Sequence, residues 1–246
     1  IRHLAYHDTL TGLPNRLLFM DRLDQAITRA IRTGNMFALL YIDIDHFKVI
    51  NESMGHDIGD DLLLKITDRL QDCVRQSDTI GRLGGDEFAI ILENILVPED
   101  VTLVAKHILS GLSQSVAIND IEVNISASIG ISVYPDDGVT LGQLLKHADT
   151  AMYKAKEQGR NTFQFYTQEM SELAMRRLEL ENSLRNAIEK DELMLYYQPK
   201  YDLSSSRCWG MEALVRWDHP EKGLIPPDEF IPLAEETGLI VQLDEW

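Results

Sequence analysis

A pair of glycines followed directly by a pair of carboxylates is the stretch of this sequence best suited to chemistry. Gly84 and Gly85 lead into Asp86 and Glu87, and apolar β-formers continue beyond them. The pattern predicts a hairpin whose tip is the glycine pair and whose second strand begins with the acids. Glycines let a backbone approach a bulky anion, and carboxylates beside such a turn can hold the divalent cations that accompany phosphates. An ordinary acidic turn would have the same composition.

A second acidic pair ends an apolar run. Phe37–Asp45 has the length and composition of a buried central strand. Asp43 and Asp45 occupy alternate positions, so we expect them to point to the same face. An acid near a core is costly unless it is paired or bound to a metal. A strand that simply emerges into solvent remains an alternative, which explains one acid better than two.

Further polar side chains follow in a stretch punctuated by glycines, which we interpret as a loop. Asn51 and Asp60 could together read a purine edge, because an amide and a carboxylate supply both donors and acceptors. Asp60 and Asp61 also provide an acidic start to the next helix, which suffices to explain Asp61. His56 by itself favours a structural role over ligand binding.

Two cation-bearing segments have alternative explanations. Arg75 and Asp78, three residues apart, could form an exposed ion pair of little energetic value, or a fork for a guanine and its phosphate. Lys156 and Arg160 are four residues apart and can share a helical face. The dipole at the C-terminal end of a helix favours cations, which suffices to explain these two residues.

Periodicity indicates the elements that position these residues. Period-two runs predict strands, and apolar residues at helical spacing predict helices. Up to residue 166 the expected strands are 37–45, the two arms of the hairpin around residues 84–85, one long strand over 121–133, and 162–166. Helices are expected after Asn15, from about residue 61, from Pro98 and from Leu141. Beyond residue 166 we expect a long charged helix, strands over 193–200 and 208–217, and a helix over 227–237.

Composition limits the class of protein. The chain has 246 residues, of which 44% are hydrophobic and 26% charged, as in ordinary globular proteins. A net charge of −17 argues against broad binding to nucleic acid or to an anionic membrane. Two cysteines without metal-ligand spacing, no apolar run of membrane-spanning length and no signal peptide indicate a cytoplasmic protein, or the cytoplasmic part of a membrane-anchored sensor. Because the chain opens at Ile1 without Met, we expect it to be a piece of a longer protein.

Taken together, these segments resemble the GGDEF family, the catalytic domains of diguanylate cyclases. The resemblance covers about residues 3–166 and is carried by five motifs in order: Asp8–Arg16, Asp43–Lys48, Asn51 to Asp60, Gly84–Phe88 and Lys156–Asn161. It implies an α/β (α+β) fold, similar to the palm of polymerases, with a central, mostly antiparallel sheet flanked by helices. It also implies the condensation of two GTP molecules into cyclic di-GMP across a homodimer, with two Mg²⁺ or Mn²⁺ ions in each active site.

The resemblance also implies a role for individual residues. The metal and catalytic carboxylates would be Asp43, Asp86 and Glu87, and the carbonyl of Ile44 would complete the metal shell. The substrate-binding residues would be the guanine readers Asn51 and Asp60, the triphosphate-binding Lys48, Lys156 and Arg160, and Gly84 and Gly85, which allow close backbone approach. Arg75 and Asp78 stand where the family carries its inhibitory product site, which favours the fork over the simple ion pair.

The second part of the chain resembles the start of an EAL domain, a cyclic di-GMP phosphodiesterase built as a TIM-like barrel. By this resemblance Glu212 would be a metal ligand, and Gln198 and Arg216 would contact substrate. A barrel needs roughly 200 residues or more, and only residues 191–246 are present, so we expect no phosphodiesterase activity from this chain. The expected organisation is a GGDEF domain over 1–166, a linker helix over 167–190 and a truncated EAL domain over 191–246. The alternative function is a catalytically silent domain that binds GTP or cyclic di-GMP and regulates the EAL half.

Overall fold

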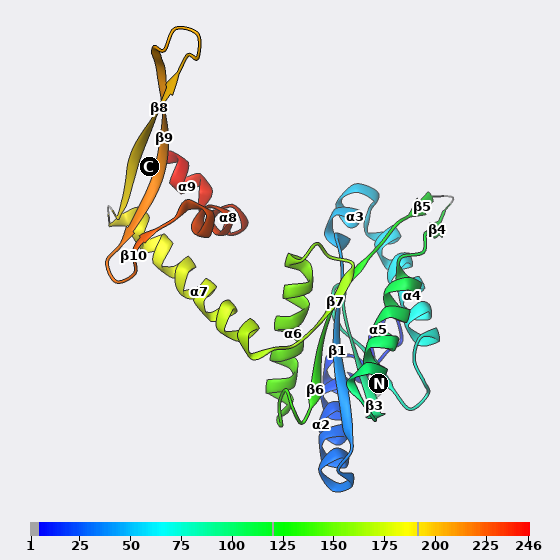
Figure 1. Ribbon diagram of the computed structural model, residues 1–246. Helices are drawn as coiled ribbons and strands as arrows, with labels where there is room; N and C mark the ends of the chain where they lie inside the picture. Colours follow the sequence, from blue (N-terminus) through cyan, green and yellow to red (C-terminus); the bar gives the residue numbers. More distant parts are fainter. Residues whose placement is uncertain (1–4, 120, 191) are drawn as a thin grey trace. The chain divides into compact units, whose positions relative to one another are not determined.

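The structure is a computed structural model that describes residues 5–119, 121–190 and 192–246. It divides into two compact units, Ile1–Ser171 and Glu172–Trp246, which are considered separately (Figure 1).

The first unit is built on a five-stranded sheet in the order β2-β3-β1-β6-β7. The strands are β1 (Met36–Ile44), β2 (Thr79–Gly84), β3 (Glu87–Ile95), β6 (Ala127–Tyr134) and β7 (Thr162–Phe165). All neighbours are antiparallel except β6 and β7, which are parallel. Every residue of β1 after Met36 is buried, as expected for a central strand covered on both faces. The predicted mixed fold with a mostly antiparallel sheet is confirmed.

Helices cover both faces of this sheet. They are α2 (Arg16–Thr33) and α6 (Leu141–Glu157) on one face, and α4 (His56–Asp72) and α5 (Pro98–Leu112) on the other (Figure 1). Leu39 and Tyr41 of β1 pack under α2 and α6, whereas Leu40 and Ile42 face α4 and α5. Gly130 of β6 lets α6 lie directly on the sheet, because a β-carbon there would be 1.9 Å from the carbonyl oxygen of Ala148.

Three local expectations were wrong. The stretch 51–60 is not a loop: α3 (Phe47–Met54) and α4 join at Gly55, so α4 begins before Asp60. The predicted strand 121–133 is two strands, β5 (Ile121–Val123), paired with β4 (Val116–Ile118), and β6, paired with β1. Period-two alternation indicates which face a residue occupies but not which strand it pairs with. The hairpin tip is Gly85 and Asp86, and β3 begins at Glu87.

The second unit has a small core of its own. The unit comprises most of α7 (Gln168–Glu189), a three-stranded sheet in the order β10-β9-β8, and two short helices. The strands are β8 (Leu193–Tyr201), β9 (Cys208–His219) and β10 (Gly223–Ile225), and the helices are α8 (Pro227–Thr237) and α9 (Ile240–Glu245). Trp217 and Phe230 pack edge to face with ring centroids 5.7 Å apart, and Leu184 and Ala187 of α7 are buried beside them. The helix expected as a linker therefore packs into this core with its second half.

The far end of the β8–β9 ribbon keeps its apolar side chains exposed, including Tyr197, Trp209 and Met211. No closed barrel is present in the part of the chain that the structure describes.

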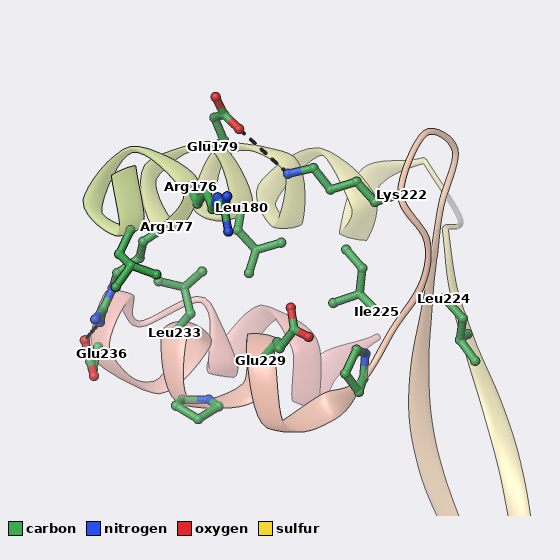
Figure 2. A pocket seen from close by; sticks show the side chains of 13 residues that line it. Arg176, Arg177, Glu179, Leu180, Lys222, Leu224, Ile225, Glu229, Leu233 and Glu236 are labelled. Atoms are coloured by element: carbon green, nitrogen blue, oxygen red, sulfur yellow. Dashed lines mark hydrogen bonds and ion pairs between the residues drawn. The ribbon is translucent and has the colours of Figure 1, made fainter. Parts of the chain in front are cut away.

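A cavity of about 740 Å³ lies between α7, α8 and β10 (Figure 2). Its lining includes the ion pairs Glu179–Lys222 and Arg177–Glu236. The side chains of Arg176 and Glu229 also line it, beside aliphatic side chains such as Leu180 and Leu233 (Figure 2). Among the described helices, none combines the length and apolar character needed to cross a membrane.

Candidate active site

The β2–β3 hairpin carries its glycines and acids to one end of the sheet. Gly84 has φ 156° and Gly85 has φ 48°, values that disfavour any residue with a β-carbon. The guanidinium of Arg82 donates to the carbonyl oxygen of Gly85 through Nε (2.9 Å) and Nη2 (2.7 Å), which fixes the turn. A β-carbon on either glycine would meet nothing within 4 Å. The backbone of the turn is therefore open to a bulky ligand.

The N-terminal motif supports this turn from behind. Asp8 accepts hydrogen bonds from the backbone N–H of Thr11 (2.8 Å), from its hydroxyl (2.7 Å) and from Nη1 of Arg82 (3.0 Å). Burial alone would raise the pKa of Asp8, but these donors and the charge of Arg82 lower it below its usual value. Asp8 thus holds Arg82 in place, and Arg82 holds the hairpin tip.

The end of β1 lies against this hairpin. Asp43 is opposite Glu87 on β3 and opposite Ser128 on β6. The backbone N–H of Ile44 donates to the carbonyl oxygen of Asp86 at 3.3 Å, which ties the strand end to the turn. The side chain of Asp43 is only 13% exposed. The three predicted metal and catalytic acids are thus brought to the same end of the sheet.

The last turn of α6 places a cation on Asp43. Nζ of Lys156 lies 2.7 Å from Oδ1 of Asp43, and the lysine side chain is 27% exposed. Burial raises the pKa of Asp43, and the charges of Asp86 and Asp45 raise it further, while the hydrogen bond and charge of Lys156 oppose the shift. Arg160 follows in an exposed turn at φ 62°. The structure therefore pairs a predicted triphosphate-binding residue with a predicted metal ligand.

Asp45 has a different role from Asp43. Its carboxylate is 3% exposed and accepts hydrogen bonds from the hydroxyls of Ser126 (2.6 Å) and Ser128 (2.7 Å) and from the backbone N–H of Asn161 (3.2 Å). It therefore joins the end of β1 to the start of β6 and to the turn after α6. The alternative that these acids simply emerge into solvent is wrong for both, because each is buried and partnered.

Two residues that sequence reasoning missed lie beside Glu87. Tyr41 is diagonal to Glu87 across β1 and β3 and is 7% exposed, so its hydroxyl lies within the electrostatic influence of the Glu87 carboxylate. Burial, followed by the charges of Glu87 and Asp149, raises the pKa of Tyr41. Partial burial raises the pKa of Asp149 on α6; the charge of Glu87 adds to this shift and that of Lys156 opposes it. Tyr41 carried a weak signal, since it shares the strand face of Asp43, but nothing in the sequence links Asp149 to the hairpin.

The predicted guanine readers lie on α3 and α4. Oδ1 of Asn51 is buried and has no hydrogen-bond partner within the described residues. Gly59 makes room for it, because a β-carbon there would be 1.9 Å from that oxygen. Asp60, the next residue of α4, is exposed. The side chain of Lys48 is 88% exposed and pairs with Glu52 at 3.7 Å, so its ion pair lies on α3 itself and not with the carboxylates at the sheet end.

The predicted inhibitory site borders a cavity of about 490 Å³. Asp78 accepts hydrogen bonds from the backbone N–H groups of Arg75 (2.9 Å) and Glu93 (3.2 Å). Among the contacts of the described residues, Asp78 is bound by the backbone of Arg75 and not by its guanidinium, so the simple side-chain ion pair is not formed. Arg22 and Arg29 of α2 also line the cavity, which the sequence did not predict.

In the second unit, the strand pairing brings the predicted EAL residues together. Gln198 on β8 is directly opposite Glu212 on β9. Lys200 lies 3.0 Å from Glu212, and the guanidinium of Arg216 stacks 5.5 Å from the ring centroid of Tyr196. Gln198 and Glu212 are exposed on the ribbon, and Arg216 is half-buried toward its base.

Comparison with known families follows this division of the chain. The profile described as "Diguanylate cyclase, GGDEF domain" matches residues 5–162. The chain belongs to the GGDEF family. A second profile, "EAL domain", matches residues 181–246. The expected order of a GGDEF domain followed by the beginning of an EAL domain is thus confirmed.

Relatives share this arrangement over the whole chain. The chain is 49% identical over 243 residues to the bifunctional diguanylate cyclase/cyclic di-GMP phosphodiesterase MucR of Pseudomonas aeruginosa, covering 99% of this chain and 35% of MucR. It is 42% identical over 246 residues to the cyclic di-GMP phosphodiesterase PdeR of Escherichia coli, covering 100% of this chain and 37% of PdeR. The chain spans about a third of the length of such curated relatives.

Solved GGDEF structures agree with the first unit. The GGDEF domain of TpbB (YfiN) from Pseudomonas aeruginosa superimposes with a TM-score of 0.67 at 38% identity, covering 69% of this chain and 99% of that one. The GGDEF domain of DgcB from Caulobacter crescentus, solved in complex with cyclic di-GMP, has a TM-score of 0.62 at 28% identity, covering 65% of this chain and 95% of that one.

The GGDEF hairpin and the end of β1 suit a divalent cation in their donor chemistry. Carboxylate oxygens of Asp43, Asp86 and Glu87 and the carbonyl oxygen of Ile44 are the hard ligands that Mg²⁺ and Mn²⁺ prefer. Oδ1 of Asp43 already binds a cationic group, the ammonium of Lys156. Within residues 5–119, 121–190 and 192–246, however, no three acidic, His or Cys side chains are close enough to form a ready-made metal group. The donor set fits the ion, but it is not preassembled.

Proposed function

We propose that this chain is a diguanylate cyclase that condenses two GTP molecules into cyclic di-GMP. One observation carries the proposal: Asp43 at the end of β1 lies opposite Glu87 of an open Gly-Gly hairpin, with Lys156 in contact with Asp43. Acids, an accessible backbone and a cation at one site are what transfer of a nucleotidyl group requires. The family membership of residues 5–162 and the curated description of MucR support the same activity.

Different residues of the site would bind the metal ions and the triphosphate. Asp43, Asp86, Glu87 and the carbonyl of Ile44 would hold two Mg²⁺ or Mn²⁺ ions, which supply a more acidic 3′-hydroxyl and a more electrophilic α-phosphate. The chain's cations, Lys156, Arg160 and Lys48, balance the charge of the triphosphate, and the backbone at Gly84 and Gly85 admits it.

Guanine recognition is assigned to Asn51 and Asp60. The buried Oδ1 of Asn51 has no donor among the described residues, and an unsatisfied buried acceptor is costly. The N–H groups of a guanine edge would satisfy it, and the exposed carboxylate of Asp60 can accept a second N–H. Gly59 preserves the space that this arrangement needs.

A homodimer follows from the stoichiometry of the reaction. One domain offers one site of this kind, whereas cyclic di-GMP contains two nucleotides. Each 3′-oxygen attacks the α-phosphorus of the other GTP, and each attack expels pyrophosphate. Two domains must therefore face each other during turnover. We assign the reaction to the cytoplasm, which supplies GTP and a reducing environment suited to the free thiols of Cys73 and Cys208.

Product feedback is assigned to the cavity beside Arg75 and Asp78. Arg22, Arg29 and Arg75 line it, and Arg29 also pairs with Glu93. Arginine pairs well with phosphate oxygens and guanine edges. DgcB has been solved in complex with cyclic di-GMP, which supports a product site on this fold.

The test is incubation of the chain with GTP and Mg²⁺, with product identified by mass spectrometry and the oligomer monitored by light scattering. Formation of cyclic di-GMP is expected. Tight GTP binding without product, while the dimer is populated, would refute the cyclase assignment.

The second candidate is a silent domain that binds GTP or cyclic di-GMP and regulates an EAL half. The relatives PdeR and NbdA, both described as cyclic di-GMP phosphodiesterases, favour it because they match the whole chain. The chain itself is not expected to hydrolyse cyclic di-GMP, since Gln198, Glu212 and Arg216 lie on an open ribbon.

A further inference from the structure

The contact between Lys156 and Asp43 joins two residues whose proposed functions compete with that contact. A metal ion at Asp43 and a triphosphate at Lys156 would each compete with the 2.7 Å ion pair seen here. The pair is largely buried, with 13% of the Asp43 side chain and 27% of the Lys156 side chain exposed. Solvent and salt therefore screen it less than they screen a surface pair.

The ammonium and a divalent cation compete for the same carboxylate. Mg²⁺ binds oxygen at about 2.1 Å, so a metal ion on either oxygen of Asp43 would lie roughly 4–5 Å from Nζ of Lys156 in its present position. Two cations at that distance repel each other strongly in a partly buried site. Metal binding at Asp43 is therefore weakened for as long as Lys156 keeps this position.

The position of Lys156 gives it another anion to bind. It lies in the last turn of α6, and Arg160 stands exposed in the turn that follows. A triphosphate carries several negative charges and can replace the single carboxylate that Lys156 would leave. The arrangement of the other acids agrees with this exchange, because the described residues hold no ready-made three-ligand group.

We propose that Lys156 makes metal binding at Asp43 conditional on a bound nucleoside triphosphate. Without nucleotide, the ammonium of Lys156 holds Asp43 and excludes free divalent cations. When a triphosphate binds, Lys156 transfers to its phosphate oxygens, and Asp43 becomes available to the metal that accompanies the nucleotide. The site thus selects the metal–triphosphate complex over the free metal. This inference rests on the proposed function, because it assumes that Asp43 is a metal ligand.

The first test measures Mn²⁺ binding to the nucleotide-free chain at pH 8 by electron paramagnetic resonance. Lys156→Met should tighten Mn²⁺ binding at least tenfold, and Lys156→Gln should act in the same direction. The matched control is Lys154→Met, which removes the same charge from the same turn but breaks a contact with Glu157 (3.0 Å), and should change the affinity less than twofold. The effect of Lys156→Met should persist at 0.5 M NaCl, since a general field effect would be screened.

The second test uses GTP in the presence of EDTA. Asp43→Asn frees Lys156 and should tighten metal-free GTP binding more than Asp86→Asn, which removes an equal charge nearby without freeing the lysine. Equal effects of Lys156→Met and Lys154→Met on Mn²⁺, or of the two Asp→Asn variants on GTP, would overturn the proposal. If these affinities behave as expected but the wild-type chain forms no cyclic di-GMP, the exchange stands and the cyclase assignment fails.

Discussion

Asp43 and Asp45 are the same residue type two positions apart, and the structure predicts opposite consequences for replacing them with Asn. Asp45 is 3% exposed and accepts three hydrogen bonds, from Ser126, Ser128 and Asn161. Asp43 is held by one cation, Lys156, and sits among other acids. We expect Asp45→Asn to destabilise the fold and Asp43→Asn to spare it.

The expected loss of stability on Asp45→Asn follows from the hydrogen bonds that the carboxylate accepts. A bond to a charged group contributes about 1.5–3 kcal/mol and a neutral one about 0.5–1.5 kcal/mol, so each bond loses roughly 1 kcal/mol when the charge is removed. The side-chain NH₂ introduced by Asp45→Asn would also point toward hydroxyl or backbone N–H groups that now donate to the Asp45 carboxylate. The expected loss is about 2–3 kcal/mol in free energy of unfolding, or roughly 5–10 °C in melting temperature.

The expected change in stability on Asp43→Asn is smaller because two effects offset each other. Its pKa is raised, so the folded state favours the protonated form and the ionised carboxylate costs stability at every pH above its unfolded value of 3.8. Neutral Asn removes that cost at pH 7.5 but loses the bond to Lys156. The net change should stay within about 1 kcal/mol, while formation of cyclic di-GMP should be lost.

Urea unfolding at pH 7.5, followed by circular dichroism, measures both variants against the wild-type chain. Asp45→Asn should shift the midpoint clearly downward without a change in slope, and Asp43→Asn should leave the midpoint nearly in place. A wild-type midpoint for Asp45→Asn, or equal losses for the two variants, would refute the division into one structural and one functional acid.

Three further outcomes are expected. Arg75→Ala should relieve inhibition by added cyclic di-GMP and leave initial turnover nearly intact, as inhibition curves would show; unchanged inhibition would contradict the product-site assignment. Asp8→Asn should cost about 1–2 kcal/mol at pH 7. Because the pKa of Asp8 is lowered, its contribution is complete above 3.8 and fades as the pH falls through the lower folded value, so the two unfolding curves should converge in acid. Tyr41→Phe should lower kcat about fivefold with KM for GTP unchanged, because it removes a hydroxyl that lies diagonal to Glu87 and influences its carboxylate. The control Tyr134→Phe, which alters the ring stacked on Phe37 at the far end of the sheet, should change neither constant.

Much of the fold was readable from local pattern. Burial on both faces made Phe37–Ile42 a continuous apolar run, and the glycines at 84 and 85 marked a turn that requires positive φ. Residues 51–60 were misread because their polar side chains and glycines suggested a loop, although Gly55 only separates two helices. The strand predicted over 121–133 was broken because alternation records the face of a strand and not its partner.

The sequence by itself determined which chemistry this chain carries: the order of its acids, glycines and cations indicated a GGDEF domain and the start of an EAL domain. Only the tertiary structure decided what each acid does. Asp43 and Asp45 have equivalent positions in the pattern, but the hydroxyls that bind Asp45 come from Ser128 in β6 and from Ser126 just before it, and the lysine that binds Asp43 comes from the end of α6. Partners more than eighty residues away along the chain leave no local signal, because folding alone brings them into contact.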